Sequence, residues 1–138
     1  MNRVIIITII VCLDDKNGMM FNGRRQSSDR VLREHIITVA KEGRLWMNEY
    51  SAEIFENADI NIHPKFLMKA NKGDYCFVEN CFLEKHIQKI DKIIVYRWNK
   101  RYPADMYFDI SLEDWKLSST TDFIGNSHEK ITEETYIK

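Results

Sequence analysis

Residues 4–18 have the sequence VIIITIIVCLDDKNG, and this stretch decides the fold. The ten residues from Val4 to Leu13 are apolar except for one threonine, and they are rich in Val and Ile, which favour strands. A run of this kind predicts a strand that is buried on both faces, as at the centre of a parallel sheet. Asp15-Lys16-Asn17-Gly18 follows it as a turn, because Asn and Gly tolerate positive φ. The run is too short to cross a bilayer as a helix and no small-residue cleavage site follows it, so we expect no membrane association and no signal peptide.

Length and composition predict one globular domain over residues 1–138. The chain has 20 Lys and Arg against 21 Asp and Glu, and this net charge of −1 argues against a nucleic-acid-binding protein. The three cysteines, Cys12, Cys76 and Cys81, are an odd number and form no CxxC pair. Free thiols are typical of a reducing compartment, so we expect a cytoplasmic protein. The β-rich C-terminal edge offers a surface through which a homodimer could pair.

A helix is expected to begin near Asp29. Ser27 or Ser28 can cap it, and an aspartate suits the positive end of the helix dipole. The apolar positions that follow recur at helical spacing, and Gly43 is placed to end the helix. The preceding residues 19–28 contain two arginines and no apolar periodicity, so we interpret them as a surface loop.

Short strand-like segments alternate with helical segments along the rest of the chain. Further strands are expected at residues 44–47, 60–62, 75–78, 93–98 and 131–137, and further helices at residues 51–56 and 81–90. This alternation predicts an α/β fold with a mainly parallel central sheet flanked by helices and an antiparallel C-terminal edge.

The order of these features resembles the dihydrofolate reductase fold family. A buried first strand ends in an acidic Asn-Gly loop, a long loop leads to an aspartate that opens a helix, and later strands run into helices. Asp105-Met106-Tyr107-Phe108, followed by Asp114-Trp115-Lys116-Leu117, is similar to the D-x-x-F-P and D-W-x-L segments of that family. Residues 25–29 also resemble the bacterial riboflavin-pathway reductase branch of the same fold. The resemblance covers nearly the whole chain and implies a dihydrofolate-reductase-like fold, with a ligand site at the carboxyl ends of the strands.

The resemblance implies where a substrate would bind. Asp29 matches the acidic residue that grips the pterin ring in the family, so it is the candidate catalytic and substrate-binding residue. The simpler alternative is that Asp29 only stabilises the N-terminus of its helix. Arg24 and Arg25, with Arg30, form a basic cluster beside the expected cleft and are candidates for binding an anionic small molecule. A solvated loop is the simpler explanation of this cluster.

The resemblance also implies two loops that bind NADPH phosphates in the family. The first loop, G-R-x-T in the family, is NEYS at residues 48–51 here, and the second, a pair of glycines, is Glu79-Asn80. Paired glycines let the backbone approach a pyrophosphate closely. Glu79 instead adds a side chain and a negative charge, which has the same sign as the charge of the pyrophosphate. The candidate cofactor-binding residues are therefore Asn48, Ser51, Glu79 and Asn80. The alternative is that Ser51 and Asn80 simply cap helices.

These replacements lead to two expectations about function. The first is a small-molecule-binding or partner-binding protein that kept the scaffold and lost NADPH-dependent reduction. The alternative is a divergent reductase of a pterin-like or pyrimidine-like substrate that uses NADPH, with Ser51 and Asn80 in contact with the cofactor. The directions of Glu49 and Glu79 discriminate between the two functions. Carboxylates that point into the phosphate path favour the binding protein, and carboxylates that point to solvent favour the divergent reductase.

Other reactive side chains predict no site of their own. Ser127-His128-Glu129 contains residue types of a hydrolase triad, but adjacent residues cannot supply the converging side chains that a triad needs. The four histidines are scattered, and no Cys/His cluster has metal-ligand spacing. We therefore expect neither a serine hydrolase nor a metal centre.

Overall fold

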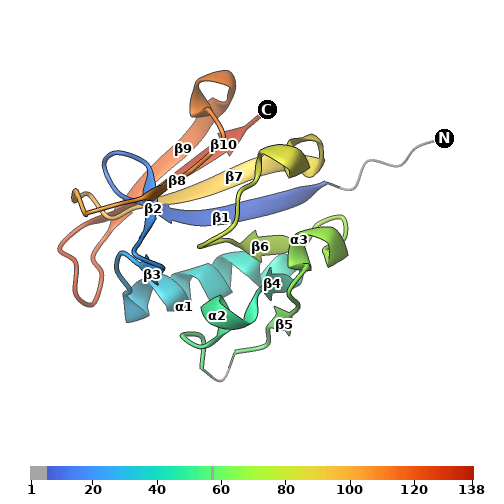
Figure 1. The fold of residues 1–138 in the computed structure, drawn as a ribbon, viewed down its shortest axis with the longest axis horizontal. Coiled ribbons are helices and arrows are strands. Elements are labelled where there is room, and N and C mark those ends of the chain that lie inside the picture. Colours follow the sequence, from blue (N-terminus) through green and yellow to red (C-terminus); the bar gives the residue numbers. More distant parts are fainter. Residues whose placement is uncertain (1–5, 57) are drawn as a thin grey trace.

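The computed structural model describes residues 6–56 and 58–138, and a large mixed sheet runs through it (Figure 1). In spatial order its seven strands are β5 (Asn61–Ile62), β4 (Leu45–Met47), β6 (Tyr75–Phe77), β1 (Ile7–Leu13), β7 (Ile90–Arg97), β10 (Ile131–Ile137) and β9 (Lys116–Phe123). Neighbours from β5 to β7 pair in parallel, whereas β10 pairs antiparallel with both β7 and β9. The predicted α/β class and its antiparallel C-terminal edge are confirmed.

A second, smaller sheet and several short helices complete the fold. The sheet has the order β3 (Arg24–Arg25), β2 (Gly18–Phe21) and β8 (Met106–Tyr107). The α-helices are α1 (Arg30–Val39), α2 (Glu49–Ala52) and α3 (Phe66–Lys69), and the 3-10 helices are η1 (Ala40–Glu42), η2 (Glu84–Lys89) and η3 (Leu112–Asp114). Within the part of the chain that is described, no helix combines the length and the apolar composition needed to cross a membrane.

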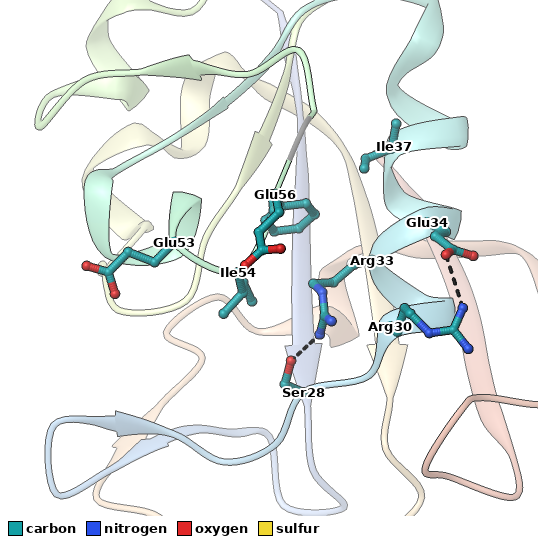
Figure 2. Close-up of a pocket in the computed structure, with 9 residues that line it drawn as sticks. Ser28, Arg30, Arg33, Glu34, Ile37, Glu53, Ile54 and Glu56 are labelled. Carbon is teal, nitrogen blue, oxygen red and sulfur yellow. Dashed lines mark hydrogen bonds and ion pairs between the residues drawn. The ribbon is translucent and has the colours of Figure 1, made fainter.

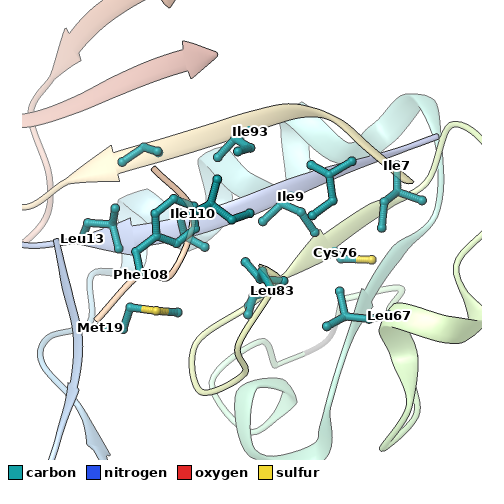
Figure 3. Packing of buried hydrophobic residues seen from close by; sticks show 14 of the residues in the cluster. Ile7, Ile9, Leu13, Met19, Leu67, Cys76, Leu83, Ile93, Phe108 and Ile110 are labelled. Atoms are coloured by element: carbon teal, nitrogen blue, oxygen red, sulfur yellow. The ribbon is translucent and has the colours of Figure 1, made fainter. Parts of the chain in front are cut away.

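The strand β1 holds the centre of the large sheet because both of its faces are apolar. Ile9 points to one face, where it belongs to a cluster with Leu83 and Phe108 (Figure 3). Ile10 points to the other face, into a second cluster with Ile36 of α1. Burying one such side chain contributes about 1.5–3 kcal/mol to the stability of the fold. Because β1 has buried side chains on both faces, it packs against both clusters. The predicted central strand is confirmed for residues 7–13, while residues 4 and 5 lie outside the described residues.

The helix α1 begins directly after Asp29. The carboxylate of Asp29 accepts the backbone N–H of Leu32 at 3.1 Å, so Asp29 is the N-cap. The prediction that Ser27 or Ser28 caps this helix is therefore wrong. The helical segment continues through η1 and ends at Gly43, as expected.

Three local predictions fail. The expected surface loop at residues 19–28 contains β2 and β3, because Met19 and Met20 are buried in the core and β2 pairs with the distant β8. The expected helix at residues 81–90 is the 3-10 helix η2, in which no residue is buried, so no apolar face holds a longer helix there. The helix expected from Ser51 onward begins earlier, at the start of α2.

The buried centre of β1 makes a direct prediction about stability. Replacing Ile9, which is 0% exposed, with Ala should lower the free energy of unfolding by about 2–5 kcal/mol, because the change removes apolar contacts and leaves a cavity. Urea denaturation followed by circular dichroism measures the loss. The matched control is Ile124→Ala, since Ile124 is 77% exposed and its replacement should change the free energy by less than about 0.5 kcal/mol. Equal losses in the two variants would contradict the packing described for β1.

Candidate functional site

Most of the candidate residues meet at one edge of the large sheet. Asn48 follows β4, and Glu79 and Asn80 lie two and three positions beyond the last residue of β6. The strands β4 and β6 are parallel neighbours, so their carboxyl ends meet at the same edge, where ligand sites of open α/β sheets form. The strand β3 adds Arg25 to the same place.

The carboxylate of Glu79 is turned inward and is held by three hydrogen bonds. Arg25 donates from Nε to Oε2 at 2.9 Å and from Nη2 to Oε1 at 3.1 Å, and the hydroxyl of Ser51 donates to Oε1 at 2.7 Å. The side chain of Glu79 is 9% exposed. A two-point Arg–carboxylate pair is among the stronger polar contacts in proteins. The negative charge of Glu79 is thus matched by a positive charge of the same chain.

Tyr50 ties Arg25 to the helix α2. Its hydroxyl accepts the backbone N–H of Arg25 at 2.9 Å, and the guanidinium carbon of Arg25 lies 4.4 Å from the centre of the Tyr50 ring. The side-chain hydrogen bonds that Arg25 donates to Glu79 raise the pKa of Arg25, so the cation is retained in this half-buried place. The cation of Arg25 is therefore held between an aromatic ring and a carboxylate.

Asn48 and Asn80 form the second pair of contacts. Asn48 caps α2, since its Oδ1 accepts the backbone N–H of Ser51 at 3.1 Å, and its Nδ2 donates to Oδ1 of Asn80 at 2.8 Å. The alternative in which Ser51 caps the helix is wrong, because its hydroxyl is directed to Glu79 instead. Asn80 precedes no α-helix that it could cap.

The structure thus brings the four predicted cofactor-binding residues together as two bonded pairs, Asn48 with Asn80 and Ser51 with Glu79. Their role toward a cofactor stays a prediction. Glu49, in contrast, is exposed, and so is Arg24. Of the two glutamates whose directions discriminate between the functions, Glu79 is turned inward with a side chain that is 9% exposed, and Glu49 lies in solvent.

Asp29 lies in a separate cluster, and its carboxylate is fully used by protein donors. Oδ1 accepts the backbone N–H groups of Leu32 and Asn126, and Oδ2 accepts the N–H of Ser127 at 2.9 Å. Burial alone would raise the pKa of Asp29, but these donors and the ring of His128 outweigh it and hold the pKa well below its usual range. Asp29 is therefore ionised at neutral pH. The structure shows the helix-capping role, and the substrate-gripping role stays a prediction.

His128 extends this cluster to a third segment of the chain. Its Nδ1 lies 2.9 Å from Oδ2 of Asp29, and its Nε2 lies 3.0 Å from Oγ of Ser27 and 3.3 Å from the hydroxyl of Tyr102. Because Asp29 is a charged acceptor, it favours the tautomer of the neutral ring that has its proton on Nδ1, and in this tautomer Nε2 accepts a hydrogen bond from a hydroxyl. The ring also stacks on Trp98, with centroids 4.5 Å apart.

The sequence analysis missed this constellation because its members are far apart in the chain. Ser27 and His128 are separated by 101 positions, and the connection between β9 and β10 brings them together. No local pattern around either residue marks the pairing. The sequence analysis named Asp29 through the resemblance and His128 through its reactive neighbours, but nothing in the sequence joined the two.

Comparisons with known proteins settle the fold. No family model matches the sequence, and no curated protein is similar to it in sequence. The structure is similar to that of dihydrofolate reductase from Enterococcus faecalis complexed with NADP(H) and RAB-propyl, with a TM-score of 0.68. The fold is that of dihydrofolate reductase. The similarity covers 96% of this chain and 95% of that chain at 12% sequence identity, so it shows the dihydrofolate-reductase-like fold alone.

A small cavity of the dihydrofolate-reductase-like fold lies between the two clusters. Its lining includes Cys12, Phe77 and Trp98 together with the polar residues Ser27 and Glu79. The volume of the cavity is about 20 Å³, which is room for about one water molecule. Pockets for small ligands usually measure about 300–1,000 Å³, so a pterin-sized ring would enter this one only if side chains moved.

A larger open groove of about 500 Å³ adjoins this cavity along α1 (Figure 2). Ser28, Arg33 and Ile54 line both spaces, which places the groove directly outside the cavity. Arg33 donates a hydrogen bond to the hydroxyl of Ser28, and Arg30 pairs with Glu34 at 3.3 Å. The groove therefore has two guanidinium groups on the side of α1.

The Glu79 cluster should contribute measurably to stability. Glu79→Ala leaves the half-buried guanidinium of Arg25 without its partner, and the free energy of unfolding should fall by about 1–3 kcal/mol. Urea denaturation measures this, with Glu49→Ala as the control, since an exposed glutamate nearby should change the value by less than about 0.5 kcal/mol. If both variants behave alike, the inward pairing of Glu79 is not present in solution.

The depressed pKa of Asp29 predicts a pH-dependent contribution to stability. A carboxylate whose pKa is lowered on folding contributes stability that is complete above its unfolded pKa, about 3.9, and is lost as the pH falls through the folded pKa. Asp29→Asn should therefore be most destabilising near neutral pH, and its difference from the wild type should shrink below about pH 4. Unfolding free energies measured from about pH 7 to pH 3 test this, and a difference that does not vary with pH would contradict it.

Proposed function

We propose that this dihydrofolate-reductase-like chain is a small-molecule-binding protein that has lost NADPH-dependent reduction. The observation that carries the proposal is the buried carboxylate of Glu79, bonded to Arg25 and Ser51 in the turn where the resemblance implied paired glycines. Arg25 and Ser51 are the charged donor and the hydroxyl that a phosphate in this turn would use. In this chain both donate to the protein's own anion.

Electrostatics gives this replacement its weight. A phosphate held about 4 Å from a carboxylate is disfavoured by about 4 kcal/mol at an effective dielectric of about 20. Because each 1.4 kcal/mol is a factor of ten, an unpaired carboxylate would lower affinity by about a thousandfold, and the adjacent cation of Arg25 offsets part of this effect. Turning Glu79 away would relieve the repulsion, but it would break the two-point contact with Arg25.

The substrate side supports the same conclusion. Both carboxylate oxygens of Asp29 already accept N–H groups of the chain, and the adjoining cavity of about 20 Å³ is too small for a bicyclic ring. The open groove of about 500 Å³ is the candidate ligand site. Since Arg30 and Arg33 line it together with Glu34, Glu53 and Glu56, its ligand is a polar molecule with groups that pair with both signs of charge.

Titration with NADPH tests the proposal and its physical reason together. Isothermal calorimetry should show binding to the wild type no tighter than about 1 mM, a level that corresponds to about −4 kcal/mol. Glu79→Gly removes the competing carboxylate and frees Arg25 and Ser51, so it should bind NADPH at least tenfold more tightly. The matched control Glu49→Gly removes an exposed carboxylate and should gain nothing.

Turnover distinguishes the alternative. If the wild type binds NADPH at micromolar concentration and oxidises it in the presence of a pterin or pyrimidine substrate, the chain is a divergent reductase and the proposal is wrong. Unchanged affinity in Glu79→Gly would show that the Glu79 carboxylate is not what excludes the cofactor.

A further inference from the structure

Ser27, His128 and Asp29 have the arrangement of a nucleophile, a base and an orienting acid. Oγ of Ser27 lies 3.0 Å from Nε2 of His128, and Nδ1 of the same ring lies 2.9 Å from Oδ2 of Asp29. The three residues come from the loop before α1, the N-cap of α1 and the connection between β9 and β10. Ser27 and Asp29 lie two positions apart in one segment, and His128 approaches both from a distant part of the chain, so the three side chains meet in the geometry by which a triad is recognised.

The base of this arrangement is firmly oriented. The side chain of His128 is 4% exposed and stacks on Trp98, while the side chain of Asp29 is 0% exposed. The backbone N–H groups of Asn126 and Ser127 hold the carboxylate in place. The hydroxyl of Ser127 also lies 3.2 Å from Nδ1, on the side of the ring that faces Asp29. The imidazole thus presents its basic nitrogen toward Ser27.

Ser27 is the hydroxyl that borders the small cavity beside the groove. It lines the cavity of about 20 Å³, whereas Tyr102, the other hydroxyl near Nε2, lines a separate polar hollow with Asp14 and Lys16. Cys12 lines the same cavity, but desolvation, and then the charge of Glu79, raise the pKa of its thiol well above the usual range. Cys12 is therefore protonated at neutral pH, which leaves Ser27 as the activated nucleophile.

The adjoining spaces define the class of substrate. The cavity next to Ser27 has room for about one water molecule, so only the smallest acyl groups would enter it, and only with a movement of the side chains that line it. The open groove outside it takes the remainder of the molecule, and Arg33, which lines both spaces, is the cationic residue of the cavity lining. Positive charge close to a reacting carbonyl stabilises an oxyanion.

We propose that this chain hydrolyses carboxylic esters with a small acyl group, using Ser27 as the nucleophile, His128 as the general base and acid, and Asp29 as the orienting residue. Oγ of Ser27 attacks the carbonyl carbon while its proton passes to Nε2 of His128. The bond to the leaving alcohol breaks as Nε2 returns that proton to the alcohol oxygen. A water molecule then attacks the acyl group on Ser27, gives its proton to Nε2, and releases the carboxylic acid as Oγ of Ser27 regains the proton. This activity needs no nicotinamide cofactor, so it goes beyond the proposed binding function and is independent of it.

The test uses the full chain, 4-nitrophenyl acetate as substrate and a fluorophosphonate as a covalent probe of activated serine. We expect hydrolysis above the uncatalysed rate and one phosphonylated residue, which peptide mass spectrometry places at Ser27. Ser27→Ala should lose the label and at least about a hundredfold in kcat/KM, because removal of a triad nucleophile leaves only binding and electrostatic effects. Ser119→Ala, a change at an exposed serine of β9, should keep both.

Two further measurements separate catalysis from a structural role of the cluster. Ser27→Cys restores a nucleophile of similar size, so it should form a detectable acyl-thioester that Ser27→Ala cannot form. A 4-nitrophenyl octanoate substrate should react at least tenfold more slowly than the acetate, because the cavity admits only a small acyl group. Label at another residue, equal rates in wild type and Ser27→Ala, or the absence of hydrolysis by the folded wild type would each overturn the proposal.

Discussion

The hydrogen bonds to the buried carboxylate of Asp29 join the start of α1 to the connection between β9 and β10. An ionised group removed from water must be matched by hydrogen bonds or opposite charge, or its burial is strongly unfavourable. Asp29 meets this requirement with donors from α1 and from the connection between β9 and β10, almost one hundred positions away. The close approach needs Gly125, since a Cβ there would lie 2.5 Å from Oδ2 of Asp29. The position of the β9–β10 connection is therefore set by a charge at the start of α1.

Glu79 obeys the same constraint by a different means. Asp29 accepts mainly neutral N–H groups and one imidazole, whereas Glu79 is paired with the full charge of Arg25. Asp29 and Glu79 each accept hydrogen bonds from groups that lie where the resemblance to the dihydrofolate reductase fold implies a ligand. The hydrogen-bonding capacity at these two points is thus satisfied without a bound molecule. The groove along α1, by contrast, keeps its guanidinium groups near open space.

The sequence predicted those parts of the molecule that depend on local patterns. The apolar run of β1 predicted a strand correctly, because burial on both faces leaves a continuous apolar stretch in the sequence, and the strand expected at residues 131–137 is β10. The predicted cofactor-binding residues proved to be neighbours, because the carboxyl ends of parallel strands converge whatever their chemistry. The resemblance implied the fold, and the structure confirms it at an identity of only 12%.

Several of the failures depend on contacts between segments distant in the sequence. The strand β2 forms because β8 pairs with it, and the N-cap of α1 is Asp29 because the β9–β10 connection supplies the remaining donors to that carboxylate. The hydrogen bond between Ser27 and His128 has the same origin, so no window of sequence contains its signal. Residues 127–129 form no triad among themselves, because side chains of adjacent residues do not converge on one another. The loop that places Asn126 and Ser127 on Asp29 also carries the next residue, His128, to the same carboxylate. The buried charge of Asp29 thereby orients the imidazole of His128 toward the hydroxyl of Ser27. The geometry of the proposed nucleophile follows from the hydrogen bonds that stabilise this charge.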